Sequence, residues 1–386
     1  MIQHNAGVRP GANVDSGVSL TTPGPELAAR IERLRASLAA AGAAGAIAIQ
    51  PHLVFYLTSA EPPVERQAAV VVTDQRVCLL WPDATPAVPG WVSVSTYPSM
   101  EEPTAWISGY ALSLGEILRS LRPRQGRWLA ADGDLVPAVI AGDVLPLVGP
   151  QVFSNLVRTK SPHEVAIIRR NLAANDSAFS AVAAGLRPGV TDLEIALWCA
   201  HAMALSHQSA VSYAGNIGLG RNGEAAGARP TGVVCRAGDT LFVDLYSRHD
   251  HYVGDSCRSF VVDPAPAWAE KAHLALERAL RAVQTELRPG VEAARLDGLC
   301  RAVLREAGLS GLLVHHTGHG TGLRAQEAPY LVPGSPARIR AGDVIAVEPG
   351  VYLEGAGGLR LEEVFHVTEG TAERLGTFDW CLTRCS

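Results

Sequence analysis

The sequence predicts an α+β protein with a small α/β N-terminal domain and a larger C-terminal domain that contains an internal repeat. Its 386 residues are enough for two domains, and 47% of them are apolar, so a large core is possible. Helix and strand patterns alternate over the first 155 residues, which is typical of α/β architecture. A helical segment followed by two acidic strands then occurs twice, which predicts two related halves.

The composition excludes several classes of protein. The net charge is −5 and no basic block occurs, which argues against a nucleic-acid surface. No apolar run approaches the roughly 20 residues that a membrane helix needs. The seven cysteines are scattered without a Cys-x-x-Cys pair, which suits a reducing compartment and argues against a disulfide framework. We therefore expect a cytoplasmic protein, and give a disulfide between Cys381 and Cys385 little weight.

The first part of the chain has an N-terminal arm and one domain. Residues 1–25 are rich in glycine, proline and serine without periodicity, so we expect a mobile arm. Residues 26–155 form the predicted N-terminal domain, whose first helix, residues 26–41, places four apolar side chains on one face. The other predicted elements are a strand over residues 46–49, a hairpin of strands 68–73 and 76–81, and a strand over 128–131. This half contains no acid–base cluster, so we assign it shape and not chemistry.

The C-terminal domain, residues 156–386, begins with a helix-start signal. Ser161 is a helix cap, Pro162 the first helical residue and Glu164 the acid of a capping box. These residues predict a long helix that ends near Gly185.

A second helix and a glycine-rich stretch follow. Thr191 is the expected cap of the second helix. Residues 211–232 contain many glycines and no clear strand pattern. We therefore expect a loop there, either on the surface or against a substrate.

An acidic hairpin comes next. Residues 241–243 are apolar and predict a buried strand that ends at Asp244, where a carboxylate is costly without a partner. A polar turn leads into a second strand, which carries Asp255. Such a hairpin can place the two carboxylates side by side. Because two buried like charges repel, a bound cation is the natural resolution, although a solvated hairpin is the common reading of one such pair.

The repetition of this pattern strengthens the cation reading. Residues 342–348 have the same layout, a Gly-Asp pair, an apolar run and then Glu348, and they continue to Glu362. The motif Leu-Arg-Pro-Gly-Val also occurs twice, at 186–190 and 287–291, each time before an acidic, helix-like segment. We expect two helix-plus-hairpin units that face one another across a pseudo-twofold axis.

A histidine-rich segment supplies a candidate nitrogen ligand. Residues 315–319 contain three histidines, and glycines flank His319 on both sides. A lone histidine is more often structural, but four carboxylates need a cation and imidazole is the commonest nitrogen donor. We therefore choose His319 as a ligand, and His315 and His316 as residues of the adjoining pocket.

These motifs resemble those of the pita-bread metallopeptidases, which include aminopeptidase P, prolidase, methionine aminopeptidase and creatinase. The resemblance runs from about Glu26 to the C-terminus and implies a creatinase-type N-terminal domain followed by a pita-bread domain. The motifs that carry it are Arg33-Leu34-Arg35, Phe55-Tyr56-Leu57-Thr58, the hairpin acids, Gly318-His319-Gly320-x-Gly322, Val347-Glu348-Pro349-Gly350 and Arg360-Leu361-Glu362.

The resemblance implies a metal site. The family's five metal ligands fall on Asp244, Asp255, His319, Glu348 and Glu362. In the family such a site usually holds two divalent ions, and manganese is the first expectation, with zinc, cobalt or iron as alternatives.

Residues around the ions also receive expected roles. Glu348 is placed to accept a proton from a metal-activated water, as in a dinuclear metal-dependent hydrolase. Arg360 either orients a ligand carboxylate or a substrate acid, or forms an ordinary salt bridge.

The chain departs from the prolidase pattern at substrate-contacting positions. Gly227 and Gln326 stand where prolidase-like members have histidines, and neither can deliver a proton at neutral pH. Tyr246 puts a bulky ring where a glycine is usual. We expect these residues and His316 to contact substrate, and His315 to take over part of the acid role. Loss of one such group typically removes about 10²–10³ in rate, so the substrate is expected to differ.

Three functions remain open from the sequence. The first is a metal-dependent hydrolase resembling Xaa-Pro aminopeptidase and prolidase, which cleaves an amide or C–N bond in a short peptide or small molecule. The second is a metalloenzyme of the same fold that acts on a small metabolite, as a creatinase-like hydrolase or a lyase. The third is a non-catalytic binding member, against which the intact ligand set counts. The resemblance also implies a homodimer.

Overall fold

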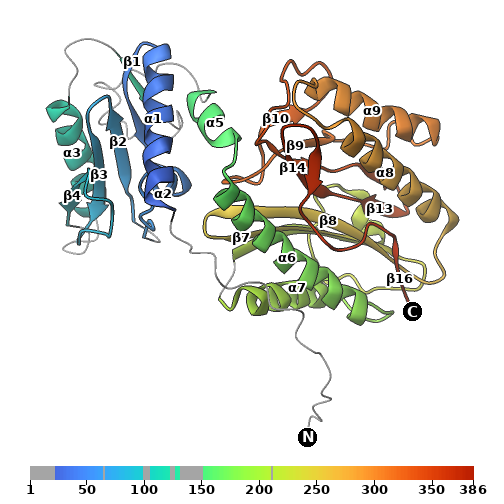
Figure 1. Ribbon diagram of the computed structural model, residues 1–386. Coiled ribbons are helices and arrows are strands. Elements are labelled where there is room, and N and C mark those ends of the chain that lie inside the picture. Colours follow the sequence, from blue (N-terminus) through green and yellow to red (C-terminus); the bar gives the residue numbers. More distant parts are fainter. Residues whose placement is uncertain (1–21, 64–65, 99–104, 122–126, 131–150, 210–211) are drawn as a thin grey trace, which may run out of the picture.

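The computed structural model describes residues 22–63, 66–98, 105–121, 127–130, 151–209 and 212–386. The expected N-terminal arm lies mostly outside these residues, and Ala131 lies outside them as well. Figure 1 shows the N-terminal elements in blue beside a larger body of helices and sheets. None of the helices in the described part of the chain is long and apolar enough to cross a bilayer.

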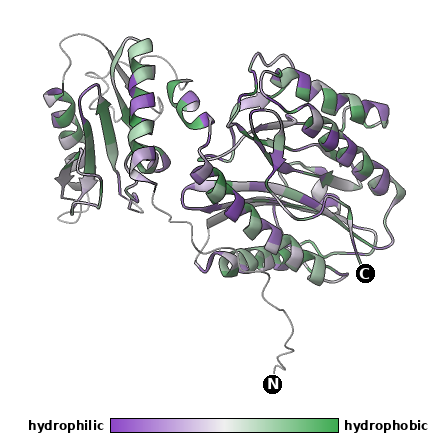
Figure 2. Cartoon of the chain, viewed as in Figure 1, coloured by the Kyte–Doolittle hydropathy of each residue, from purple (hydrophilic) through white to green (hydrophobic). Residues whose placement is uncertain are grey.

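The N-terminal domain is a five-stranded sheet with helices packed on it. Its elements are α1 (Gly24–Ala40), β1 (Ala43–Ala48), α2 (Pro51–Thr58), β2 (Ala69–Thr73), β3 (Val77–Pro82), β4 (Val92–Tyr97), α3 (Ala105–Ser120) and β5 (Arg127–Ala130). The strand order is β4-β3-β2-β1-β5, and β2 pairs with β3 in antiparallel fashion. The predicted first helix, strands and hairpin are thereby confirmed. Strands β2 and β3 are almost wholly apolar and buried, as their green colour in Figure 2 indicates.

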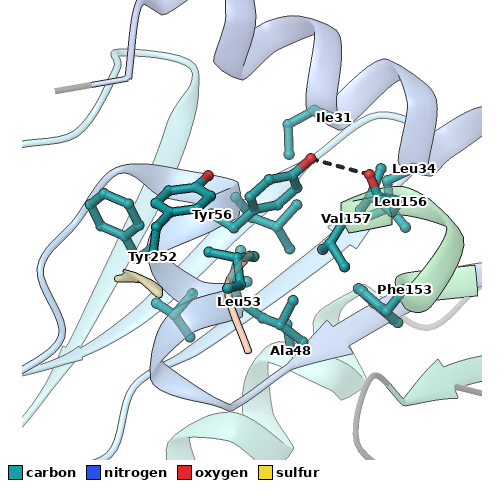
Figure 3. Packing of buried hydrophobic residues seen from close by; sticks show 14 of the residues in the cluster. Ile31, Leu34, Ala48, Leu53, Tyr56, Phe153, Leu156, Val157 and Tyr252 are labelled. Atoms are coloured by element: carbon teal, nitrogen blue, oxygen red, sulfur yellow. Dashed lines mark hydrogen bonds between the residues drawn. The ribbon is translucent and has the colours of Figure 1, made fainter. Parts of the chain in front are cut away.

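Helix α5 (Gln151–Arg158) connects the two parts of the chain. Its apolar side chains Phe153, Leu156 and Val157 pack against α1 and α2 in one buried cluster (Figure 3). The hydroxyl of Tyr56 donates to the Leu156 carbonyl at 3.2 Å. The expected boundary between residues 155 and 156 falls inside this helix.

The first half of the C-terminal body is a helix pair packed on a sheet. It comprises α6 (Pro162–Gly185), α7 (Asp192–His207), β6 (Ser212–Leu219), the short helix η1 (Gly220–Glu224), β7 (Thr240–His249) and β8 (Tyr252–Val262). The predicted capping box forms at Ser161 with Glu164, and the predicted cap Thr191 forms a second capping box with Glu194. Side chains of α6 and α7 share a core with β6, β7 and β8.

The second half repeats this arrangement with shorter strands. It comprises α8 (Ala267–Glu286), α9 (Ala293–Glu306), β9 (Gly318–Gly320), β10 (Glu327–Leu331), β11 (Val344–Val347), β12 (Gly350–Leu353), β13 (Gly357–Arg360), β14 (Glu363–Val367), β15 (Ala372–Arg374) and β16 (Thr383–Cys385). The sheets have the orders β10-β9-β11-β14-β15 and β16-β8-β7-β6, with β12 and β13 forming a separate ribbon. Helices α8 and α9 share a core with β11, β13 and β14.

The predicted repeat extends to individual hydrogen bonds. Gly189 donates to the Cys235 carbonyl, and Gly290 donates to the Ile339 carbonyl in the other half. Both glycines have a positive φ, near +94° and +88°, which explains why the Pro-Gly sequence is kept in both copies. The two halves therefore use the same turn between the two helices of each pair.

The prediction of a loop over residues 211–232 is wrong in its first part, because β6 forms there and pairs with β7 along its whole length. The glycines that suggested a loop allow close packing. A Cβ atom at Gly215 would collide with the Asp244 carbonyl oxygen, and one at Gly218 would collide with the Phe242 ring.

All seven cysteines are free thiols, including Cys381 and Cys385. Six of them are buried, and only Cys381 is exposed. Burial raises the pKa of Cys199 to about 12 and that of Cys300 to about 12, so these thiols behave as small apolar side chains.

Candidate metal centre

The candidate site lies where the two sheets meet. In the β7–β8 ladder Asp244 is opposite Cys257 and Tyr246 is opposite Asp255, so both acids project from the same face. The backbone N–H of Glu362 donates to the Cys257 carbonyl at 3.1 Å, which joins the first sheet to the start of β14. The two halves are therefore in direct contact at the acidic residues.

Strand alternation brings the remaining ligand candidates to this junction. His319 on β9 is opposite Ala346 on β11, and Ala346 is opposite Val364 on β14. Side chains two residues apart share a face, so Glu348 and Glu362 project on the same side as His319. The acids of the two hairpins thus reach a common face through the same strand alternation.

Four of the five predicted ligands converge closely. Among the described residues, two groups bring three ligand atoms to within 4.8 Å of one another, and both contain His319. Asp255 and Glu362 complete the first group, and His316 and Glu348 complete the second. The Nε2 atom of His319 lies 3.2 Å from Glu348 Oε1 and 3.8 Å from Asp255 Oδ2.

The orientation of His319 suits a ligand. Its Nδ1 lies 2.9 Å from the Gly320 carbonyl oxygen, which can only accept, so Nδ1 must carry the proton in this bond. The lone pair of a neutral ring is then on Nε2, the atom that faces the carboxylates.

Asp244 lies outside both close groups and has partners of its own. Its Oδ2 accepts from Arg360 Nη1, from the Tyr246 hydroxyl at 2.8 Å and from Asn216 Nδ2 at 3.1 Å. Its Oδ1 is buried and has no partner among the described residues. Arg360 thus neutralises this carboxylate while leaving one oxygen directed elsewhere.

Unpartnered buried atoms show that the cluster fits a cation. Both Oδ atoms of Asp255, Oδ1 of Asp244, Oε1 of Glu348 and Nε2 of His316 lack a hydrogen-bond partner in the described structure. His316 Nε2 and Glu348 Oε1 are only 2.7 Å apart, but they are not aligned for a hydrogen bond. Buried polar atoms are normally satisfied, so a set of donor atoms left open at one point is the expected arrangement around metal ions.

The pKa shifts of the clustered side chains also fit a site for a bound cation. Burial raises the pKa of Asp255 and that of Glu362 well above their usual range, and the neighbouring acids add to this effect. Burial acts to lower the pKa of His319, but Glu348 and Asp255 outweigh it and raise that pKa to about 9. Without a cation the cluster therefore retains protons that a divalent ion would displace.

His315 lies beside the ligand candidates, as expected for a residue of the adjoining pocket. Its Nδ1 donates to the His316 carbonyl at 2.6 Å and its Nε2 lies 2.9 Å from the Tyr352 hydroxyl. Burial lowers its pKa, so the ring is neutral near pH 7. Both nitrogens are engaged and Glu348 is 3.8 Å away, a geometry that weighs against His315 as a proton donor. His316, with Nε2 beside Glu348, is better placed.

The two positions that lack histidine lie at the edge of the site. Gly227 is exposed, and a Cβ atom there would meet nothing within 4 Å in the described structure, so the space beside this position is open. Gln326 is exposed, whereas its neighbour Glu327 is buried and accepts from Lys160 Nζ at 2.6 Å. Gln326 borders a cavity instead of joining the acidic cluster.

Sequence reasoning missed two residues that hold this site. Asn216 on β6 binds both Asp244 and Tyr246, but its segment had been interpreted as a loop. Tyr352 on β12 accepts from Arg360 Nε at 2.7 Å and contacts His315. The signal available for Tyr352 was its position four residues after Glu348, close to the predicted ligand in the chain.

Two family models match the chain. The model of metallopeptidase family M24 matches residues 166–369, and the model of the creatinase/prolidase N-terminal domain matches residues 30–125. The probable dipeptidase PepE of Mycobacterium tuberculosis is 33% identical over 239 residues, 62% of this chain. The Xaa-Pro dipeptidase of Pyrococcus furiosus is 30% identical over 229 residues, 58% of this chain. Each match spans only 64% of the relative's own length.

Solved structures share the fold over nearly the whole chain. Dipeptidase PepE from Mycobacterium ulcerans superposes with a TM-score of 0.81 at 27% identity, covering 94% of this chain and 99% of that one. The prolidase from Pyrococcus horikoshii gives a TM-score of 0.79 at 19% identity, covering 91% and 99%. The pita-bread fold expected from the motifs is thereby confirmed.

Proposed function

The chain belongs to metallopeptidase family M24, and from this premise we propose that it hydrolyses an amide bond in short peptides by means of a metal-activated water. One observation carries the proposal. Open donor atoms on Asp244, Asp255 and Glu348, contributed by both halves of the C-terminal body, are buried without hydrogen-bond partners. The similarity to a probable dipeptidase and to an Xaa-Pro dipeptidase supports the same reaction class.

The ions would be held by the five residues that match the family pattern: Asp244, Asp255, His319, Glu348 and Glu362. Four carboxylates and one imidazole suit hard to borderline divalent metals, so we expect two ions, with manganese first and zinc, cobalt or iron as alternatives. When bound, such ions would lower the pKa of a water and polarise a substrate carbonyl.

Two side chains are placed to handle the proton. Glu348 is the base in this proposal, because its Oε1 is unpartnered and faces the cluster. His316 Nε2 is 2.7 Å from that oxygen and is also unpartnered, so after a small reorientation of the ring it could pass the proton toward the leaving nitrogen. His316 thus replaces His315 as the expected acid, and takes part of the task that the family assigns to the histidines missing at Gly227 and Gln326.

Arg360 and His315 act in this proposal as positioning residues. Arg360 binds Asp244, the Tyr352 hydroxyl and the Ala226 carbonyl oxygen, so one guanidinium fixes a ligand and a neighbouring phenol. His315 holds the same phenol from its other side. The salt bridge to Asp244 favours the role of orienting a ligand carboxylate over that of binding a substrate acid.

The experiment is a peptide panel with the metal-loaded full-length protein. We expect manganese-dependent cleavage of dipeptides, with Xaa-Pro peptides turned over about 10²-fold or more slowly than a prolidase would, because two proton-handling histidines are absent. Asp244→Ala should abolish metal binding and activity together. Asp263→Ala is the matched control, since this acid pairs with Arg384 at the surface. Bound metal with no turnover of any peptide would refute a peptidase and favour the small-metabolite alternative.

We also propose that the protein is a cytoplasmic homodimer. Seven free thiols, six of them buried, suit a reducing compartment. Light scattering of the purified protein tests the dimer, and a monomeric mass at micromolar concentration would contradict it.

A further inference from the structure

Tyr246 lies beside the ligand candidates of the first hairpin. It follows Asp244 by two residues on β7, so the two side chains project from the same face of the sheet. In the β7–β8 ladder Tyr246 is opposite Asp255, and in the β6–β7 ladder Asn216 is opposite Asp244. Polar side chains from three neighbouring strands therefore share the face that carries the acids.

The hydroxyl of Tyr246 is bonded to Asp244. It donates to Asp244 Oδ2 at 2.8 Å, and it accepts from Asn216 Nδ2 at 2.9 Å. The same amide nitrogen also donates to Asp244 Oδ2 at 3.1 Å. The phenol and the amide thus form a triangle of hydrogen bonds with one carboxylate oxygen, and the proton of the phenol is used within this triangle.

The guanidinium of Arg360 competes with an ion for the same carboxylate. A guanidinium often binds both oxygens of a carboxylate in a two-pronged pair, which would leave Asp244 no free oxygen. Here Arg360 Nη1 donates to Oδ2, while its Nε donates to the Tyr352 hydroxyl at 2.7 Å. Oδ1 of Asp244 stays buried and has no hydrogen-bond partner among the described residues.

We propose that Tyr246 is a positioning residue which, together with Asn216, holds Asp244 so that Oδ1 stays open for a divalent ion. Three donors from three strands, β6, β7 and β13, bind Oδ2. They occupy the lone pairs of that oxygen, whereas those of Oδ1 remain free. The inference rests on the proposed metal-dependent function, and it gives Tyr246 a role in addition to the substrate contact expected from the sequence.

Manganese binding by the full-length protein tests this role without reference to turnover. Removal of a ligand lowers the number of ions bound at saturation, whereas loss of a group that orients a ligand typically lowers the affinity about 10–100-fold. Tyr246→Phe removes the hydroxyl and keeps the ring. It should raise the manganese dissociation constant about tenfold and leave the number of ions at saturation unchanged, as measured from the electron paramagnetic resonance signal of free Mn²⁺.

Tyr97→Phe is the matched control, because this buried phenol donates to the Gln67 carbonyl at 2.6 Å in the N-terminal domain. Each of the two variants loses one hydrogen bond of a buried phenol, so we expect a similar small decrease in the thermal midpoint measured with chelator. Only Tyr246→Phe should change the manganese dissociation constant. An equal loss of affinity in Tyr97→Phe would show a general effect of lower stability and would overturn the positioning role.

Asn216→Leu provides a second test, because it removes the amide from the triangle and leaves the phenol in place. It should also raise the manganese dissociation constant while the number of ions at saturation stays the same. Unchanged affinity in both Tyr246→Phe and Asn216→Leu, or tighter binding in Tyr246→Phe, would show that Asp244 needs no such support.

The same titrations separate this inference from the proposed function. A wild-type protein that binds no manganese would refute both. A wild-type protein that binds manganese with the same affinity as the two variants would refute the inference and leave the proposed function standing. If Tyr246→Phe binds manganese more weakly as expected, but the metal-loaded wild type cleaves no peptide, the peptidase proposal fails and the positioning role remains.

Discussion

Two acids of one hairpin have opposite surroundings. Asp244 receives a guanidinium, a phenol and an amide on Oδ2, whereas neither oxygen of Asp255 has a partner in the described structure. Both side chains are at most 1% exposed. Asp244 is therefore stabilised by the protein itself, and Asp255 depends on a bound cation. In the metal-free protein, buried Asp255 should therefore lower the free energy of unfolding. In the metal-loaded protein it should not.

Replacing Asp255 by Asn tests this cost. Burial raises the pKa of Asp255, so in the metal-free protein its contribution is favourable when it is protonated and is lost as pH rises through the folded-state pKa. At about pH 8 the metal-free Asp255→Asn variant should be more stable than the metal-free wild type by about 1–3 kcal/mol. With metal added the order should reverse, because the variant lacks a ligand. Urea unfolding with and without chelator measures both.

Asp263→Asn is the control, since this acid is partly exposed and pairs with Arg384 at the surface. This variant should change the free energy of unfolding by no more than about 0.5 kcal/mol, either with metal or without it. If Asp255→Asn destabilises the metal-free protein as much as the metal-loaded one, Asp255 has a structural role and the metal account of this residue is wrong.

Which acids are candidate ligands was predictable from the sequence. The residues that hydrogen-bond to these acids were not. Equal spacing of acids after two apolar runs indicates which carboxylates share a face, because strand alternation is local. The pairing of Arg360 with Asp244 joins residues 116 positions apart, and the bond from Asn216 comes from a strand that was not predicted. Such partners depend on how the two halves meet, which no local pattern in the chain describes.

At the scale of elements, glycine has two structural roles in this chain. In β6 it permits a strand to pack closely, as Gly215 and Gly218 do against β7. In the turns at Gly189 and Gly290 it permits a positive φ. Long segments with caps, such as α6 and α7, were predictable because their signals are local. Strand β6 was not predictable in this way. Its pairing with β7 and its contact with η1, and not its own sequence, determine that it is a strand.

Helix α7 ends against the tip of the β7–β8 hairpin, where a second set of histidines lies. The His207 ring stacks on His249, with 4.6 Å between centroids, and Arg170 binds Asp250 beside them. Burial lowers the pKa of His207 to about 4, with His249 and Arg170 adding to the effect and Asp250 opposing it. This element junction should therefore be sensitive to acid.

The sign of this sensitivity follows from linkage. The folded-state pKa of His207 is below its usual value, so its contribution to stability is present above about pH 6.5 and is lost as pH falls toward 4. His207→Gln should reduce the loss of unfolding free energy between about pH 7.5 and pH 5, measured by urea unfolding.

His201→Gln, an exposed position on the same helix, is the control and should leave the pH dependence unchanged. An unchanged pH dependence in His207→Gln would show that this junction does not resist protonation. His52 has a pKa lowered in the same direction, so part of the acid sensitivity should remain in either variant.

At the scale of the whole molecule, one buried cation joins the two bodies. Arg30 of α1 is fully buried, binds Glu26 at 2.7 Å, donates to the Tyr56 carbonyl at 3.1 Å and lies 3.7 Å from Glu164 of α6. Its guanidinium stacks on the Tyr56 ring at 4.1 Å. This contact therefore connects α1 of the N-terminal domain to α6 of the C-terminal body.

Arg30→Met should therefore lower the stability of the protein. It leaves Glu164 buried without its cation, which typically costs about 3–5 kcal/mol. We expect a lower thermal midpoint, with metal content retained. Arg35→Met on the same helix is the control, because Arg35 pairs with the exposed Glu32 and should cost less than about 1 kcal/mol. Equal stability of the two variants would show that Arg30 does not join the bodies.

The most direct test of the account is the metal content of the purified full-length protein after loading with manganese and removal of free metal. We predict roughly two ions per chain for the wild type and for Asp263→Asn, and fewer than about one for Asp255→Asn and Glu362→Gln. Absence of bound metal in the wild type, or an unchanged ratio in the two ligand variants, would contradict the claim that the facing hairpins form a metal centre.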